Sequence, residues 1–228
     1  MTRALTWVVA GDLLHLWRYD RQLPIQCSAL DFVRDLPRFL VLLLAMQRFE
    51  NRHWGLNRHV DPNFGKLSTA STTMLIEDPK EGPVDVILDC SPDKQVSHYD
   101  LSGRATNVYS MTSQKFGSRG KLAAKFSWGE ESRMGEPEIL KRVYEIAEKE
   151  PDVRNHVPVM VFSHVFSDSS TAITRERLSL PKEGARVLYM TIFEELMQMT
   201  KLAGDPFLEC WWHTVKCECL PVLGSNLH

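Results

Sequence analysis

The stretch KLAAKFSWGE ESRMGEPEIL KRVYEIAEK, residues 121–149, decides the fold. Its first part, residues 121–128, is short and apolar, which predicts a strand. Its second part, residues 136–149, predicts a helix that Pro151 terminates. One face of this helix carries apolar residues at helical spacing: Ile139, Leu140, Val143, Ile146 and Ala147. We therefore expect a strand followed by an amphipathic helix.

Two charged residues in this stretch are candidates for an ion pair. Lys125 ends the tetrad LAAK, in which small residues leave room for a flat ligand against the strand. A lysine ammonium is compact enough to approach two phosphate groups at once. Glu136 precedes the apolar stripe and is expected on the buried face, where a carboxylate needs a cationic partner. Two other interpretations stay open, an ordinary edge-strand lysine and a glutamate that only complements the helix dipole.

The elements around this stretch extend the pattern in a defined order. Strands are predicted at residues 96–102 and 107–112, separated by Gly103-Arg104-Ala105, and again at 157–166 and 186–193. A last amphipathic helix is predicted at 206–217. The order strand, glycine turn, strand, lysine strand, glutamate helix, strand, strand is that of the ATP-binding lobe of a protein kinase.

The glycine turn alone is a weak indication. A kinase loop has the pattern Gly-x-Gly-x-x-Gly, whereas here Gly103 stands alone and Ala105 occupies the place of a second glycine. Arg104 is a candidate phosphate contact or a solvated arginine, and Val108 is expected to pack on the adenine base. A single glycine by itself predicts only a turn.

The first 95 residues predict a separate set of elements before the kinase-like order begins. Residues 4–20 are predicted to form a hairpin around Gly11-Asp12. Residues 37–49 are predicted to form a helix so rich in apolar residues that we expect it buried on most sides or packed between two layers. A surface loop is predicted at 51–72, and two strands at 73–76 and 84–88. Residues 167–171 read as a polar turn. We divide the α+β chain into an N-terminal region (1–95), a kinase-like N-lobe (96–200) and a C-terminal helix with an aberrant tail (201–228).

Composition narrows the function classes. The chain has 228 residues, 43% hydrophobic and 25% charged, with a formal net charge of −2, so no global basic field favours nucleic acid or an anionic membrane. The five scattered cysteines form no Cys-x-x-Cys pair, so we predict no metal site and reduced thiols in the cytosol or nucleus. We predict no signal peptide, and the longest apolar run, 39–46, falls far short of the roughly 20 residues of a membrane span.

Several segments together resemble the fungal-type protein kinase family. They are LWRYDRQ (16–22), FVRDLPRFL (32–40), LSGRATNV (101–108), KFSW (125–128), EPEILK (136–141), RVL (186–188) and WW (211–212). The resemblance runs from about residue 7 to about 217. It implies a protein-kinase-like fold with ATP and Mg²⁺ as cosubstrate and phosphoryl transfer to Ser or Thr. By the same resemblance Lys125 takes the phosphate-binding role, Glu136 is its partner, and 193–196, FEEL, is the hinge.

The resemblance implies a cofactor-binding set drawn from these segments. Its members are Gly103, Arg104, Ala105, Val108, Ala123, Lys125, Glu194 and Leu196. The sequence departs from the family in one respect, since it contains neither His-Arg-Asp nor Asp-Phe-Gly. We therefore expect a chain truncated before the catalytic loop, inactive alone, whose last helix with Trp211 and Trp212 invites self-association or chaperone binding.

Two other function classes stay open. One is a pseudokinase-like module that binds a protein partner without catalysis. The other is a nuclease-like front half, since a hairpin followed by a helix also occurs in restriction-endonuclease-like folds. The second lacks an upstream Asp and Glu-x-Lys pair of carboxylates for two-metal hydrolysis.

Overall fold

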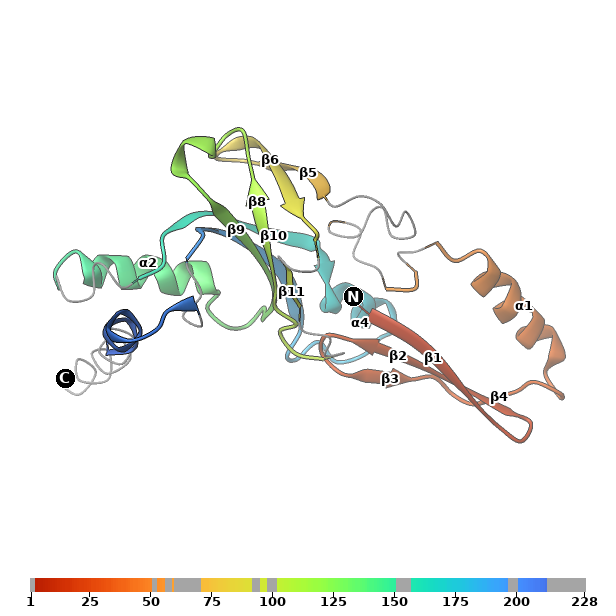
Figure 1. Cartoon of the computed structure of the whole chain (residues 1–228). Helices are drawn as coiled ribbons and strands as arrows, with labels where there is room; N and C mark the ends of the chain where they lie inside the picture. The colour runs from red at the N-terminus through yellow and green to blue at the C-terminus, as the bar shows by residue number, and fades with distance from the viewer. Residues whose placement is uncertain are drawn as a thin grey trace.

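The computed structural model describes residues 3–50, 53–55, 59, 71–91, 95–97, 102–150, 157–196 and 201–212. Across these residues the fold is α+β, as predicted, with two antiparallel sheets and helices at their edges and faces (Figure 1). Three predicted regions lie wholly or partly outside the described residues: residues 98–101 of the predicted strand 96–102, most of the predicted loop 51–72, and residues 213–217 of the predicted last helix.

A long hairpin forms the N-terminal sheet. β1 (Arg3–Ala10) pairs with β2 (Leu13–Asp20) from Arg3↔Asp20 to Ala10↔Leu13, and Gly11 in the turn has a φ of 59°, which glycine adopts without strain. Two short strands, β3 (Pro24–Gln26) and β4 (Leu30–Asp31), pair with β2. The predicted hairpin at 4–20 is therefore present.

Helix α1 (Leu36–Gln47) follows, with proline in its first turn as predicted. The expectation that it is buried on most sides is wrong for this structure. Met46 is its one buried residue, whereas Leu40, Val41 and Leu44 are 54%, 66% and 49% exposed. The dense apolar pattern predicted that other residues cover the helix. Among the described residues, these apolar side chains stay largely uncovered.

A second, larger sheet contains seven strands in the order β10-β11-β9-β8-β6-β5, with β7 also pairing with β8. Their bounds are β5 (Ser71–Asp78), β6 (Gly82–Asp89), β7 (Gln95–Ser97), β8 (Asn107–Thr112), β9 (Leu122–Glu130), β10 (Met160–Ser170) and β11 (Arg186–Glu194). All its pairings are antiparallel. Residue 102 lies in a bend, so the strand predicted at residues 96–102 does not extend to residue 102.

Alternation along β9 separates the two faces of this sheet. Leu122, Ala124, Phe126 and Trp128 are at most 6% exposed and face the main core, whereas the residues between them are half-buried on the opposite face. The core residues include Val84, Val86 and Leu88 of β6 and Leu188, Met190 and Ile192 of β11. Burial of one face in this way fixes the register, because a shift by one residue would exchange the faces.

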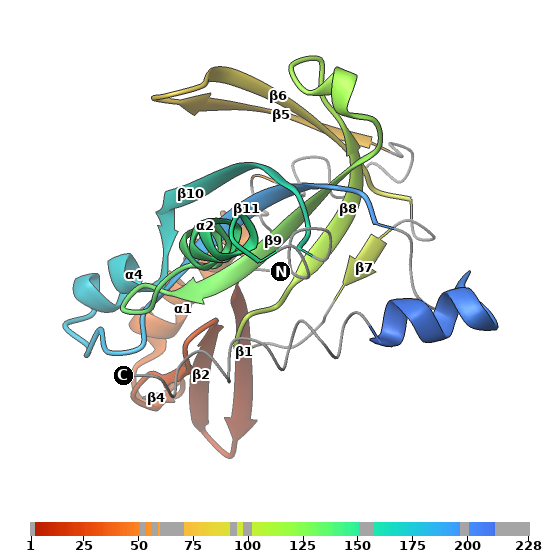
Figure 2. The same cartoon turned by 90° about the vertical axis from the view of Figure 1, so that its left-hand side faces the viewer.

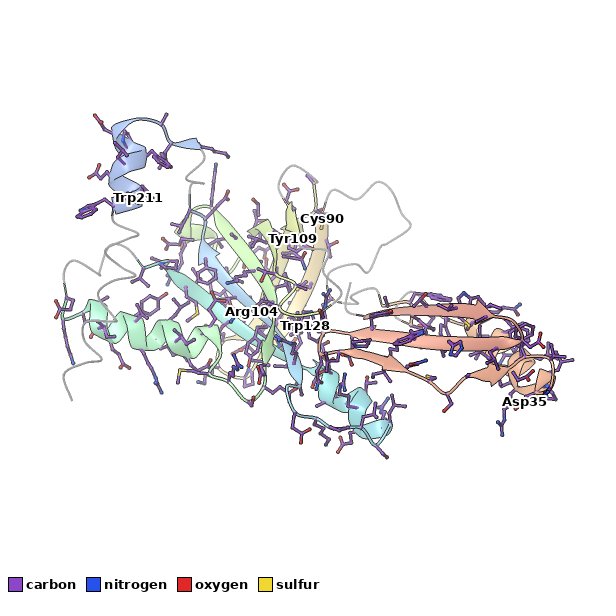
Figure 3. The ribbon with its side chains drawn as sticks, turned by 90° about the horizontal axis from the view of Figure 1, so that it is seen from below. Asp35, Cys90, Arg104, Tyr109, Trp128 and Trp211 are labelled. Atoms are coloured by element: carbon purple, nitrogen blue, oxygen red, sulfur yellow. The ribbon has the colours of Figure 1, made fainter. Side chains whose placement is uncertain are left out.

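Helix α2 (Glu136–Ala147) follows β9, and helix α4 (Thr171–Arg177) follows β10 (Figure 2). The predicted turn at 167–171 is wrong. Residues up to Ser170 continue β10, and Ser170 caps α4 by accepting the N–H of Ala172 at 3.0 Å. Residues 205–212 are helical and carry Trp211, remote from Asp35 at the start of α1 (Figure 3). Among the described helices, none is long and apolar enough to cross a membrane.

Candidate functional site

Lys125 projects from the middle of β9 on the face opposite the main core. Its register partners are Val108 on β8 and Thr191 on β11. Directly paired residues in a sheet point to the same face, so these three side chains form a row across it. Ala123 lies two residues before Lys125 and shares the face. The local sequence LAAK thus leaves a surface of small and medium side chains beside one ammonium group.

Glu136 is the first residue of α2, and its Oε1 lies 2.6 Å from Nζ of Lys125. The two side chains are 41% and 28% exposed, so the contact is a half-exposed ion pair linking strand to helix. Glu136 was expected on the buried face of the helix, and its side chain is half-exposed there. The predicted stripe is only partly covered, since Leu140 and Ala147 are buried while Ile139 and Ile146 are about half exposed.

A cleft of about 260 Å³ opens around this ion pair. It lies between the exposed face of β9 and β11, the N-terminal turn of α2 and the segment before β8. Its lining includes Arg104, Thr106, Lys125, Ser127, Trp128, Gly129, Glu130, Arg133, Met134, Gly135, Glu136, Ile139, Arg186 and Tyr189. Four of these side chains are cationic and two are acidic, and one acidic group, Glu130, forms an ion pair with Arg133 at 2.9 Å. The cleft thus favours an anionic ligand.

The Tyr189 ring forms one wall of the cleft and packs closely against Gly129 and, less tightly, Gly135. A Cβ on Gly129 would lie 2.7 Å from Cε2 of Tyr189, and a Cβ on Gly135 would lie 3.3 Å from its Cε1. Burial, together with the carboxylates of Glu138 and Glu131, raises the pKa of the Tyr189 phenol above its usual 10.0. The phenol is therefore a neutral hydrogen-bonding group at physiological pH.

The glycine turn borders the cleft through one of its predicted residues, Arg104. Gly103 has a φ of 82° and Ala105 a φ of 40°, both in the left-handed region. The Arg104 carbonyl accepts the Trp128 N–H at 2.8 Å, which extends the β8–β9 pairing toward the end of β9. Of the predicted turn residues, Arg104 lines the cleft, whereas Ala105 is buried and Gly103 is not in the lining.

The other predicted cofactor residues lie along the same face or at its edge. Val108 and Ala123 share the face of Lys125 without lining the cleft. Glu194 ends β11 opposite Leu122, and Leu196 follows it and is 67% exposed. The structure thus brings together Lys125, Glu136 and Arg104 and sets the hinge residues apart from them. The roles assigned to these residues stay predictions.

Sequence reasoning missed several cleft residues, chiefly Thr106, Ser127, Arg186 and Tyr189. Ser127 could have been found, because it lies two residues beyond Lys125 on the same strand. Tyr189 is the register partner of Ser127, and this pairing depends on a connection of more than fifty residues. Among the described residues no group of three or more His, Cys, Asp or Glu side chains is arranged to hold a metal ion.

Comparison with known proteins adds one finding. A sequence model described as fungal protein kinase matches residues 4–199, most of the chain. The chain belongs to the fungal protein kinase family. The match confirms the resemblance drawn from the sequence, and it spans both sheets and every cleft residue. No curated protein and no solved structure matches this member of the family significantly.

Proposed function

We propose that this chain carries the ATP-binding lobe of a protein kinase and binds ATP beside Lys125. The observation that carries the proposal is the 2.6 Å ion pair between Lys125 and Glu136, which joins a strand to the helix that follows it. In protein kinases a strand lysine binds the phosphates and a helix glutamate holds that lysine. Membership of the fungal protein kinase family supports the same function.

The strand order supports the lobe assignment. β7, β8, β9, α2, β10 and β11 occur in the order strand, strand, lysine strand, glutamate helix, strand, strand, with the short helix α4 between β10 and β11. In the kinase pattern Gly-x-Gly-x-x-Gly-x-Val, counting back from Val108 puts Gly103 on the middle glycine and Thr106 on the last. In this alignment the valine of the pattern, Val108, is the register partner of Lys125. It differs from the alignment in the sequence analysis, which puts Ala105 in the place of a second glycine.

The donor set in the cleft fits the phosphates of a nucleotide. Lys125, Arg104 and Arg186 offer cationic donors, and Thr106 and Ser127 offer hydroxyl groups. Val108 and Ala123 provide the apolar surface for the adenine ring, with 194–196 as the segment next to its edge. Mg²⁺ commonly binds through one or two carboxylates and the phosphates themselves, so we assign these residues to the nucleotide and none to the metal.

Phosphoryl transfer requires additional groups that orient the nucleophile and hold the metal ions. The sequence contains neither a His-Arg-Asp nor an Asp-Phe-Gly triplet, which supply those groups in kinases. We therefore propose that these 228 residues, tested by themselves, bind ATP without turnover. Transfer of phosphate to a Ser/Thr substrate that Lys125→Met abolishes would contradict this.

The test of nucleotide binding compares two lysines of one strand region. Lys125→Met removes the ammonium from the cleft, whereas Lys121→Met removes an exposed lysine that does not line it. We expect Lys125→Met to weaken the binding of a fluorescent ATP analogue, measured by titration, at least tenfold, and Lys121→Met to leave it unchanged. Equal affinities for both variants and the parent would refute the proposed site.

A second candidate function is a non-catalytic protein-binding module. It is favoured by the helix at 205–212, where Leu208, Trp211 and Trp212 are 59%, 50% and 53% exposed. In this case the chain would bind itself, a chaperone or another protein and would not bind ATP. The titration above separates the two functions, because only the first requires that the ATP analogue bind.

A further inference from the structure

A tight turn at residues 20–23 joins β2 to β3 and contacts residues outside the N-terminal sheet. Oδ1 of Asp20 accepts the N–H groups of Gln22 at 2.8 Å and Leu23 at 3.0 Å, which fixes the turn. Asp20 and Arg21 are only 4% and 3% exposed. Burial of these two charged side chains is costly and requires partners, and Oδ2 of Asp20 has no hydrogen bond among the described residues.

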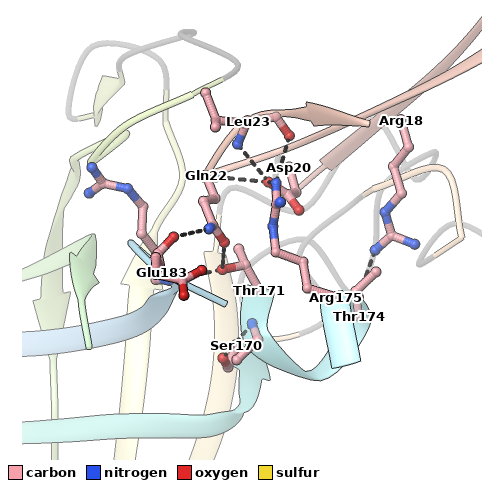
Figure 4. A network of polar contacts seen from close by, with 11 residues as sticks. Arg18, Asp20, Gln22, Leu23, Ser170, Thr171, Thr174, Arg175 and Glu183 are labelled. Carbon is pink, nitrogen blue, oxygen red and sulfur yellow. Dashed lines mark hydrogen bonds and ion pairs between the residues drawn. The ribbon is translucent and has the colours of Figure 1, made fainter. Parts of the chain in front are cut away.

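Helix α4 supplies the partners of this turn (Figure 4). Nη2 of Arg175 lies 3.4 Å from Oδ1 of Asp20 and donates to the Leu23 carbonyl at 3.2 Å. Arg175 is itself 6% exposed, so this is a buried ion pair with shared hydrogen bonds. Such a pair restricts geometry strongly, since moving either partner leaves a buried charge uncompensated.

One line of contacts leads from this turn to the glycine segment. The Arg21 carbonyl accepts the N–H of Gly103 at 2.9 Å. On the other side of Gly103, the Arg104 carbonyl accepts the Trp128 N–H at 2.8 Å. The segment 103–104 is thus held between the N-terminal sheet and the end of β9, with the Arg104 side chain lining the cleft.

A second line of contacts reaches the cleft through α4. The Thr171 hydroxyl donates to Oε1 of Gln22 at 3.1 Å and accepts the N–H of Arg186 at 2.8 Å. The Arg186 guanidinium in turn donates to the Trp128 carbonyl at 3.1 Å and lines the cleft. Two arginines of the cleft are therefore connected, through different residues, to the same turn at 20–23.

We infer that Asp20, Arg175 and Thr171 are positioning residues that hold the glycine segment and the cleft arginines in place for the phosphates. The N-terminal sheet then acts as a fixed support for the nucleotide site, from outside the cleft. This inference rests on the proposed function. Its physical basis is that apparent affinity falls in proportion to the fraction of molecules whose site is correctly arranged.

The first test uses two substitutions of Asp20 in the full chain. Asp20→Ala removes the acceptor that shapes the turn, whereas Asp20→Asn keeps an oxygen acceptor and loses only the charge. We expect hydrogen exchange of residues 102–106, measured without nucleotide, to speed up at least fivefold in Asp20→Ala and less in Asp20→Asn, which keeps the acceptor of the turn but leaves the buried Arg175 without its counter-ion. Equal exchange in the parent and in a folded Asp20→Ala would overturn the inference.

The second test avoids variants that fail to fold, and it uses two threonines of one helix. Thr171→Val breaks the line to Arg186, whereas Thr174→Val removes only the acceptor of an Arg18 N–H at 2.9 Å, away from the cleft. A lost hydrogen bond corresponds to about a fivefold effect, so we expect exchange at 102–106 and the dissociation constant of the ATP analogue to rise about fivefold in Thr171→Val alone.

The two measurements separate the inference from the proposed function. If the parent chain does not bind the ATP analogue, the proposed function fails, while the exchange of residues 102–106 still decides whether the turn supports the glycine segment. If Thr171→Val and Thr174→Val change exchange equally, or if neither changes it while both stay folded, the positioning role is refuted.

Discussion

Replacing Gly129 by alanine tests the close contact between β9 and the Tyr189 ring. The new methyl group would lie 2.7 Å from Cε2, 3.0 Å from Cδ2 and 3.7 Å from Cζ of that ring. The pairing of β11 with β9 and β10 fixes the backbone of Tyr189, so the ring can make room only by turning its side chain away from its present position. Overpacking of this kind costs about 1–3 kcal/mol, and alanine recovers about 0.4–1 kcal/mol by restricting the unfolded chain. We expect a net destabilisation of about 1–2 kcal/mol.

Thermal and urea unfolding measure this effect. For a domain of this size each kcal/mol shifts the melting temperature by about 2–4 °C, so Gly129→Ala should melt about 2–8 °C lower. Gly117→Ala is the matched control, because a Cβ there meets nothing within 4 Å and the residue has no positive φ. We expect this control to melt at or slightly above the temperature of the parent chain.

A double variant identifies the cause. In Tyr189→Leu the ring is absent, so adding Gly129→Ala should cost much less than it does in the parent chain. The contact reasoning would be refuted if Gly129→Ala melts like Gly117→Ala, or if its cost is unchanged once the ring is removed.

Three further predictions concern charge, pH and the last described helix. Glu136→Gln should change the free energy of unfolding by less than about 1 kcal/mol, because the ion pair is half exposed, yet weaken the binding of an ATP analogue about two- to fivefold by freeing Lys125. Glu145→Gln, on the exposed side of α2, is the control. Equal affinities of the two variants would count against the role of Glu136. Burial lowers the pKa of His164 below 6.5, although the Asp78 carboxylate opposes this. The folded state then binds the proton less readily than the unfolded chain, so stability, measured by urea unfolding, should fall as the pH drops below about 6.5. His164→Gln should remove that dependence on pH. A double variant, Trp211→Ser with Trp212→Ser, should reduce self-association in analytical ultracentrifugation, whereas Trp7→Ser, at a residue 45% exposed on β1, should not; loss of association in the control alone would assign it to the N-terminal sheet.

The sequence predicted the elements whose signals are local. The 4–20 hairpin, the strands of residues 73–76, 84–88, 107–112 and 121–128, and the helix from Glu136 follow from turn residues, alternation and helical spacing within a few residues of each other. Helix α4 was missed because the polar run from Ser167 to Thr171 favours a turn. Its helical state depends on a cap by Ser170 and on contacts with Arg18 and Asp20, about 150 residues away.

The exposure of α1 and of Glu136 shows that helical periodicity does not predict how deeply a face is buried. A helical pattern states which side chains share a face, but what covers that face is a long-range property. The cleft contains both kinds of contact, those set by local sequence and those set by distant parts of the chain. Lys125 and Glu136 are eleven residues apart, so the end of β9 and the short turn before α2 fix their approach almost by themselves.

Arg104 and Arg186 reach the same cleft from other parts of the chain, and hydrogen bonds connect each of them to the turn at 20–23. That turn is buried only because the N-terminal sheet docks on α4, through Asp20 and Arg175. No spacing in the sequence relates residue 20 to residue 175. A short-range ion pair can therefore be predicted from one strand and one helix, whereas the anion-binding character of the cleft is a property of the assembled fold. If the N-terminal sheet supports the cleft as we infer, the segment 4–95 of the family match belongs to the nucleotide site as much as the strand that carries Lys125.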